Sequence, residues 1–481
     1  MHKMKKIFSF IMTCLMLPSF PACDFLNVEE LGKSDIPTYF SDVNALEPAI
    51  YGTYSLLYTF YDRYMLQYGE LKSDEIKLSG TDATLSTFYN FEETTYDESS
   101  FVGLIWKNGY NIINNANHII YYAPKLLPDN PGSADLINNV TAQAYFVRAL
   151  VHFDLCKCYA QTYTYTSDAS HLGVPVVTRI QALTDKISRS DVKTVYSQIL
   201  TDLNTALSLF TESYSKSSYF ASPLACKALM ARIYLYMHDY DNAAKYASEV
   251  ISSKSLTPRD KYTAMYNNIS SEADLGEESI FRINGFLQGN QLRNMYLYSE
   301  PDATPSEKVI SLFEDDRDVR LGLFSYKTAS KDYNNVCMKF ICTRSDITDE
   351  NKHYDPFVLR VSEMYLIRAE AYCAMDRLDD AENDIRALES RAIGIPQDEV
   401  IIEYSTAEEL DDIISTERIK ELCFEGHRLF DITRKHENLE RSKDCISPVM
   451  TLAYPDYRFI LPIPMVEIEA NDAIKPNPTT N

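Results

Sequence analysis

ARIYLYMHDYDNA at residues 231–243 and AEAYCAMDRLDDA at residues 369–381 are two copies of one pattern. Alanine, tyrosine, aspartate and alanine recur at the same spacing in both copies. Small residues on one face of a helix let a partner helix approach closely, and a polar break between two periodic stretches marks a turn. The pattern therefore predicts a helix, a tight turn and a second helix that restarts on alanine.

This unit resembles the tetratricopeptide helix–turn–helix repeat, and Arg148-Ala149 opens a weaker third copy. Apolar positions also recur every three or four residues in segments 144–158, 192–209, 225–251, 359–385 and 413–432. The copies lie far apart, so insertions interrupt the repeats, and such insertions usually emerge on one face. The predicted fold class is all-α: a tetratricopeptide-like helical-repeat scaffold with irregular loop insertions and few short strands.

Three stretches break the helical pattern. Residues 66–100 are polar and aromatic, and residues 255–355 lack a sustained helical period, with strand-like runs such as 336–342. After Lys443 the chain carries six prolines. Proline removes a backbone donor and disfavours helix, so this end is predicted to be an extended segment that wraps the body.

Composition excludes several functions. The 481 residues carry a formal net charge of −23, which argues against nucleic acid as a partner, because phosphate binding needs a surplus of lysine and arginine. Only 14 glycines, against 35 tyrosines, disfavour a nucleotide fold built on glycine-rich loops. The sequence has no H-E-x-x-H, no paired zinc-spaced cysteines and no Walker glycine loop, so no metal site and no cofactor are predicted; calcium bound in an insertion is the alternative.

The N-terminus has the layout of an export signal. Lys3, Lys5 and Lys6 precede an apolar run at 7–17 that is too short to span a bilayer. The junction Ala22-Cys23 resembles a bacterial lipobox, although an ordinary secretory cleavage beside an incidental cysteine is the alternative. We therefore expect a lipoprotein signal peptide at 1–22 and lipidation of Cys23. Regions 23–220 and 221–481 follow, as two parts of one integrated globular body.

Glu417, Glu421 and Glu425 lie on one helical face at four-residue spacing. Paired carboxylates serve glycoside hydrolysis as acid and nucleophile or base. The alternative is structural, with ion pairs that neutralise the three glutamates. The favoured interpretation is the structural one, and the cations expected to supply these ion pairs are Arg418, Lys420, Arg428 and Arg434.

Aromatic and amide residues of the insertions are the better signal of binding. The C–H face of a sugar ring packs on an aromatic ring, and its hydroxyls need planar donors and acceptors. The predicted ligand-binding residues are Tyr89, Asn90, Phe91, Phe286, Asn290, Gln291 and Tyr296. The only tryptophan, Trp106, opens a core helix and is predicted to be buried.

An ordered series of motifs resembles the SusD/RagB surface lipoproteins of Bacteroidetes. The motifs are Asp24-Phe25-Leu26 after Cys23, Trp106 with Asn114 and Asn117, Arg148 in its helix, Gly173 to Val177, the Arg360 helix with Glu363 and Arg368, the stretch from Glu417 through Gly426 and Asp431 to Arg434, and Leu461-Pro462 with Pro476-Asn477. The most specific is the stretch from Glu417 to Arg434. Together they cover nearly the whole mature chain.

The resemblance implies a function that composition alone does not give. It implies that the insertions build a shallow glycan site, and that the protein captures an oligosaccharide without cleaving it. It further implies a lipid anchor in the outer membrane, with exposure at the cell surface, and delivery to a TonB-dependent, SusC-like transporter. Capture of peptides, as in the RagB branch, is one alternative, and a surface glycoside hydrolase is another.

Overall fold

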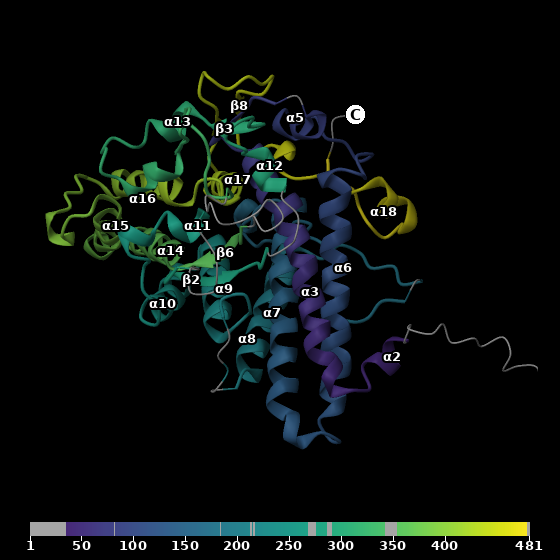
Figure 1. The fold of residues 1–481 in the computed structure, drawn as a ribbon. Helices are drawn as coiled ribbons and strands as arrows, with labels where there is room; N and C mark the ends of the chain where they lie inside the picture. The colour runs from purple at the N-terminus through teal and green to yellow at the C-terminus, as the bar shows by residue number, and fades with distance from the viewer. Residues whose placement is uncertain are drawn as a thin grey trace, which may run out of the picture.

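The computed structural model describes residues 35–478, except 81, 183, 212–213, 215–216, 268–275, 286–290 and 342–353. The signal peptide, Cys23, Phe286 and Asn290 therefore lie outside the described residues. Helices dominate the molecule, and the predicted all-α class is confirmed (Figure 1).

The α-helices vary from single turns to 26 residues. They are α2 (Ile36–Tyr39), α3 (Leu46–Phe60), α4 (Leu66–Leu71), α5 (Ala83–Tyr89), α6 (Phe101–Tyr122), α7 (Ala134–Tyr159), α8 (Val192–Leu209), α9 (Pro223–Tyr236), α10 (Tyr240–Ile251), α11 (Ala264–Asn267), α12 (Gln291–Met295), α13 (Glu307–Ile310), α14 (Val361–Ala374), α15 (Leu378–Ile393), α16 (Ala407–Leu422), α17 (Arg428–Arg434) and α18 (Met465–Ala470). A π-helical turn, η2 (Tyr61–Met65), joins α3 to α4.

The two copies of the repeat form the predicted helix–turn–helix units, α9–α10 and α14–α15. His238 and Asp376 occupy the same place in the two turns, and both adopt a left-handed backbone conformation, with φ of 57° and 60°. The next backbone N–H then donates to the carbonyl oxygen five residues earlier, at 2.9 Å in the first copy and 2.8 Å in the second. Equivalent sequence positions therefore make equivalent turns.

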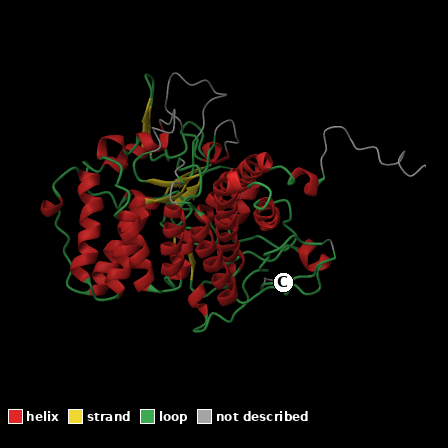
Figure 2. Cartoon of the chain, turned by 90° about the horizontal axis from the view of Figure 1, so that it is seen from below, coloured by secondary structure: helices red, strands yellow, loops and turns green. Residues whose placement is uncertain are grey.

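The helices pack side by side as a layered array. α7 packs between α6 and α8, α10 packs against α9 and α14, and α14 contacts α15 and α16. The long helices α3, α6 and α7 form one side of the body, and the repeat helices form the other (Figures 1 and 2). Arginine–carboxylate pairs join successive helices, at 2.7 Å for Arg148–Asp202 and 2.6 Å for Arg368–Asp384.

Strands are few and short, as Figure 2 shows. In the described part of the chain they form four two-stranded antiparallel sheets. The pairs are β1 (Ile76–Leu78) with β3 (Ala303–Pro305), β2 (Ser279–Arg282) with β6 (Phe357–Arg360), β4 (Ser325–Lys327) with β5 (Asp332–Asn334), and β7 (Leu439–Glu440) with β8 (Thr451–Leu452). The run predicted at 336–342 is not a strand over its described part; the strands of this insertion lie elsewhere.

The C-terminal segment wraps the body, but it is not free of helix. The backbone N–H of Leu461 donates to Cys158 at 2.7 Å, and Asn477 Nδ2 donates to the carbonyl of Tyr159 at 2.8 Å. The prediction of a wholly extended segment after Lys443 is wrong, because α18 starts directly after Pro464. Proline fits there because the first turn of a helix has no intrahelical partner for its N–H.

Among the described residues one large hydrophobic cluster runs through the helical array, with two smaller clusters beside it. Trp106 lies in the large one at 3% exposure, as predicted. A close backbone approach joins α4 to the turn after α16. A Cβ on Gly69 would lie 2.5 Å from the carbonyl oxygen of Gly426, and Gly426 itself has a φ of +77°. Glu70 accepts the Gly426 N–H at 2.7 Å, so this close approach is also hydrogen-bonded.

Replacing Gly69 with alanine tests this packing. The new methyl group meets backbone atoms that cannot move aside, so Gly69→Ala should lower the free energy of unfolding by about 3 kcal/mol or more, or prevent folding. Gly52→Ala is the matched control on α3, where a Cβ meets nothing within 4 Å. That change should raise stability by about 0.5–1 kcal/mol. Equal unfolding midpoints in urea for the two variants would contradict the packing described here.

Candidate ligand-binding pocket

The described aromatic residues of the predicted site are buried. Tyr89, Phe91 and Tyr296 are 1%, 8% and 0% exposed. Their rings therefore cannot offer a face to a sugar at the surface, and that part of the predicted site is wrong. The cause is the folding of both insertions onto the helical body instead of away from it.

Arg441, far along the chain, shows how the first insertion is fixed. Its guanidinium group lies 3.7 Å from the centre of the Tyr89 ring and donates to the Tyr89 carbonyl at 2.8 Å. In the second insertion, the Tyr296 ring packs between Phe340 and Phe424, with centroid distances of 5.8 Å to each. Both tyrosines therefore serve the core.

The structure does not bring the two described amide residues of the predicted site together. Asn90 accepts a hydrogen bond from Ser447 Oγ at 2.9 Å and so faces the C-terminal segment. Gln291 begins α12, and its backbone N–H donates to the buried carboxylate of Asp62 at 3.3 Å. Asp62 belongs to η2 and also accepts from the Tyr354 hydroxyl, so a buried anion anchors this insertion.

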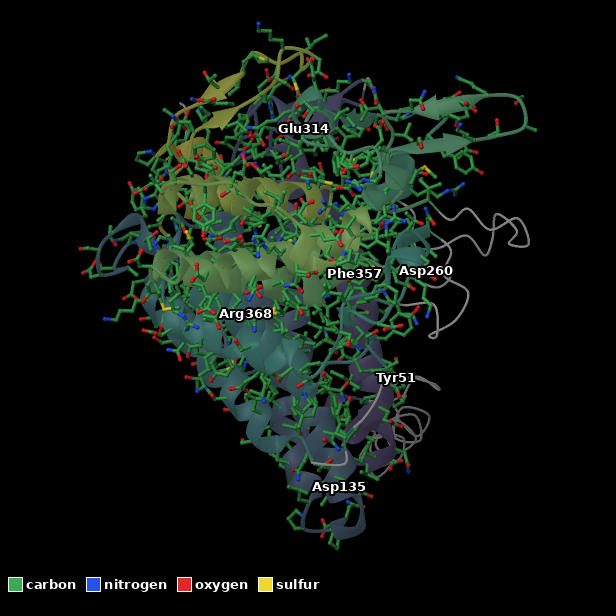
Figure 3. All side chains as sticks on the ribbon, turned by 90° about the vertical axis from the view of Figure 1, so that its left-hand side faces the viewer. Tyr51, Asp135, Asp260, Glu314, Phe357 and Arg368 are labelled. Carbon is green, nitrogen blue, oxygen red and sulfur yellow. The ribbon has the colours of Figure 1, made fainter. Side chains whose placement is uncertain are left out.

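A different group of aromatic residues does line a pocket at the surface. We call it the aromatic pocket; its volume is about 320 Å³. Tyr51 is 42% exposed and points outward from α3 (Figure 3). The lining residues are Tyr51, Tyr54, Ser55, Tyr219, Phe220, Ile283 and Asn284. They come from α3, from the segment before α9 and from the end of β2.

Phe220 holds the rings of this pocket in place. Its centroid lies 5.6 Å from that of Tyr51, with planes at 51°, and 5.7 Å from that of Tyr54, with planes at 82°. The Tyr54 hydroxyl donates to Gln143 Oε1 at 2.9 Å and accepts from the Ala221 N–H at 3.0 Å. Burial raises the pKa of Tyr54 well above its usual value, so this group stays a neutral donor and acceptor.

Asp355 fixes the opposite rim. Its carboxylate accepts from the Tyr219 hydroxyl at 2.7 Å and from the Gly285 N–H at 2.7 Å. The exposed side chain of Asn284 is therefore held beside the aromatic rings. Rings that offer apolar faces, with hydroxyl and amide groups at their edges, match the surface of a sugar.

The sequence contains two weak signals for this pocket, in α3 and in the segment before α9. Tyr51 and Tyr54 are three residues apart, which places them on one face of α3. Tyr219 and Phe220 end a serine-rich segment, where two adjacent aromatic residues are unusual. Neither signal shows that the two pairs meet in space.

A second partly exposed aromatic cluster lies at the β4–β5 hairpin, which projects from the body (Figure 3). The Tyr298 centroid lies 4.4 Å from that of Tyr326 and 5.0 Å from that of Tyr333. These residues belong to the insertion that was expected to bind. Their rings pack against one another at the base of the hairpin.

The three glutamates of α16 and the following turn are buried and bound to cations. Arg360, the last residue of β6, contacts Glu421 at 2.6 Å and Glu425 at 2.9 Å. Arg320 contacts Glu417 at 2.5 Å. The predicted structural role therefore agrees with the geometry.

The predicted partners of these glutamates are mostly wrong. Of the four cations named from the sequence, Lys420 does contact Glu417, at 3.3 Å. Arg418 instead binds Asp431 at 2.7 Å, and Arg428 binds Asp74 at 2.8 Å. Arg434 binds Glu370 and Asp431. Distant residues supply the charge because the helix packs against several other elements.

The pKa values of Glu417 and Glu421 are shifted in opposite directions, but the two residues do not form a catalytic pair. Burial alone would raise the pKa of Glu421, but Arg391, Arg360 and Arg320 outweigh it and hold the pKa well below its usual value. Burial raises the pKa of Glu417 to about 7. A hydrolase needs its acid and base beside a bound sugar, whereas Glu417 is 2% exposed. Among the described residues, no group of three or more His, Cys, Asp or Glu side chains could hold a metal ion.

Comparison with known proteins agrees with this geometry. The SusD family profile matches residues 324–479, and a profile described as starch-binding associating with outer membrane matches residues 24–235. SusD-like protein P2 of Formosa agariphila is 24% identical, over 96% of this chain and 97% of its own. SusD-like protein P38 of the same organism is also 24% identical, over 71% of this chain and 74% of its own.

Solved structures give the same result. A SusD superfamily protein from Bacteroides thetaiotaomicron matches with a TM-score of 0.79 and 25% identity, covering 91% of this chain and all (100%) of the other. Another, from Bacteroides vulgatus, matches with a TM-score of 0.78 and 27% identity, covering 91% and 99%. The chain belongs to the SusD/RagB family, as its motifs indicated. Within the described residues, no helix has the length and apolar character needed to cross a membrane.

Replacing Glu421 tests its structural role. Glu421→Gln leaves Arg360 and Arg391 buried without full neutralisation, so the free energy of unfolding should fall by about 3–5 kcal/mol. The ligand affinity of the protein that remains folded should not change. Glu408→Gln, at an exposed position on the same helix, should change stability by less than about 0.5 kcal/mol. Chemical denaturation at pH 7 measures both, and an unaltered midpoint for Glu421→Gln would refute the structural role.

Proposed function

We propose that the protein captures an oligosaccharide at the cell surface and does not cleave it. The observation that carries this proposal is the aromatic pocket, where side chains from three separate segments, two of which supply aromatic rings, surround a space that fits a sugar ring. Membership of a family described as starch-binding supports carbohydrate as the ligand class. An open pocket buries only part of a ligand, so binding should be weak to moderate.

The chemistry of the pocket favours binding over hydrolysis. Its described lining contains tyrosine, phenylalanine, serine, isoleucine and asparagine, and no carboxylate. Asp355, on the rim, already accepts two hydrogen bonds that maintain the shape of the pocket. Glycosidases need two carboxylates that flank the bond to be broken. Release of reducing ends from a bound glycan would contradict this part of the proposal.

Removing the Tyr51 ring tests the site. Tyr51→Ala should weaken binding of a retained glycan roughly five- to tenfold, because one ring contact contributes about 1 kcal/mol beyond its buried area. Tyr121→Ala is the matched control, since this ring is also exposed but lies on α6, outside the pocket. Melting temperatures should stay nearly constant in both variants.

Titration calorimetry on glycan and peptide libraries measures these affinities and separates the two ligand classes. Equal loss of affinity in the two variants, or no loss in Tyr51→Ala, would show that the ligand does not bind in the aromatic pocket. Selective binding of peptides would favour the RagB-like alternative.

We further propose that lipid on Cys23 anchors the protein to the outer membrane. The support is the signal layout of residues 1–22 and the family's description as associating with outer membrane. Several acyl chains, at roughly 0.8 kcal/mol for each buried CH₂, give stable attachment. Cys23→Ala should therefore release the protein from the membrane fraction and abolish palmitate labelling, while Cys226→Ala, a buried core cysteine, should not. Membrane retention of an unlabelled Cys23→Ala protein would contradict the anchor.

Delivery to a SusC-like, TonB-dependent transporter completes the proposed role. A binder held on the outer leaflet needs a route for its ligand across the membrane, and the family resemblance implies this partner. The helical body would cover the mouth of the barrel through a large interface. Extraction in mild detergent should recover such a barrel with the anchored protein, and repeated recovery of the protein alone would refute this step.

A further inference from the structure

A second pocket lies next to the aromatic pocket and has a different chemistry. We call it the serine–lysine pocket; its volume is about 390 Å³. Ser217, Ser218 and Ser222 line it, and Lys227 and Lys254 supply its positive charge. The same stretch of chain lines both pockets, because Tyr219 and Phe220 face the aromatic one. Residues 217–222 therefore contribute to the walls of both pockets.

Some hydroxyl groups of this pocket have hydrogen-bond partners within the protein, and two have none. Ser279 Oγ donates to Ser218 Oγ at 3.0 Å, and Ser222 caps the N-terminus of α9 at the Ala225 N–H, 3.2 Å away. Ser217 Oγ and the Tyr214 hydroxyl are shielded from solvent and have no hydrogen-bond partner among the described residues. Buried polar groups normally form hydrogen bonds, so these two hydroxyl groups are available to bind a ligand.

The lysines differ in how they are neutralised. Lys227 forms an ion pair with Glu249 at 2.8 Å, with both side chains about one-third exposed. Lys254 is half-buried and forms no ion pair with any described residue, although Glu277 acts on it at longer range. Burial lowers the pKa of Lys254, which means that its charge is poorly solvated. An anion would relieve that cost.

Because the chain as a whole is strongly acidic, a lysine in this pocket indicates a local site for an anion and not a general attraction to polyanions. A formal net charge of −23 repels polyanions in general, so non-specific attraction cannot bring an acidic polymer to this surface. A half-buried lysine among hydroxyl donors is the composition of a local anion site. The first turn of α9 adds the positive end of a helix dipole to the same pocket.

We propose that the serine–lysine pocket binds an anionic substituent of a sugar, so that the ligand of this protein is an acidic oligosaccharide. The aromatic pocket holds a sugar ring and the neighbouring pocket holds the charged group of an adjoining residue. This inference rests on the proposed function, and it narrows the substrate class from glycans in general to glycans that carry carboxylate or sulfate groups.

The test is affinity electrophoresis of the soluble chain, without its signal peptide and anchor, on a defined panel. Polygalacturonate and alginate carry carboxylates, dextran sulfate carries sulfates, and starch, galactan and xylan are neutral. At least one acidic polymer should retard the protein, and raising the salt from 50 to 500 mM should reduce that retardation. The acidic polymer that binds shows whether the group is a carboxylate or a sulfate.

Two matched variants locate the effect. Lys254→Gln should weaken binding of the acidic polymer roughly tenfold, because it removes a charge-assisted hydrogen bond. Lys245→Gln makes the same change of charge at an exposed position on α10 that does not line the pocket, and it should have little effect. Lys254→Arg should retain most of the affinity.

Each remaining outcome decides the question. Binding of neutral polymers alone, or equal affinities for Lys254→Gln and Lys245→Gln, overturns the acidic ligand while the proposed glycan capture stands. Retardation by no polymer in the panel overturns both.

Discussion

Arg360 is the residue on which the rest of the structure most depends. It ends β6 and directly precedes α14, and its guanidinium group reaches Glu278 beside β2 at 2.8 Å and Glu421 on α16 at 2.6 Å. It also donates to the main-chain carbonyl of Glu421 at 2.7 Å. One side chain thus joins the repeat helices to the β2–β6 sheet. That sheet leads into Asn284, so the rim of the aromatic pocket is tied to the helical scaffold through this cluster.

The ion-pair cluster around Arg360 determines how the neighbouring elements pack more than it adds to the free energy of unfolding. Taking charges out of water costs several kcal/mol for each ion, and attraction within the protein offsets this only when every group is well paired. Arg360, Arg391, Arg320 and Lys339 satisfy three glutamates in this way. Removing one partner leaves the others buried with excess charge. A cluster of this kind therefore fixes how the elements pack, and the aromatic pocket lies away from these carboxylates.

Sequence alone predicted the features that depend on local pattern. The two repeat copies could be predicted because each helix–turn–helix unit is formed by one short continuous stretch of sequence. His238 and Asp376, at equivalent positions, also adopt the same backbone conformation in the turn. The ion partners of Glu421 were not predictable, because Arg360 approaches from the end of β6 and Arg391 from α15. Burial of Tyr89 depends on Arg441, which the topology brings from the far end of the chain. Composition can show that an insertion is rich in aromatic residues, but only packing decides which rings face water. The aromatic pocket was missed for the same reason, since α3, the segment before α9 and β2 meet only in the fold.

The central claim is that ligand binds on the surface formed by Tyr51, Phe220 and Asn284, and that the buried glutamates only support that surface. A crystal structure of the protein with an oligosaccharide that it retains tests this claim most directly. The account predicts a sugar ring stacked on Tyr51 or Phe220, hydrogen-bonded to Asn284, with the Arg360 cluster unchanged. A sugar bound instead against Glu417 and Glu421, with those carboxylates released from their arginines, would contradict it.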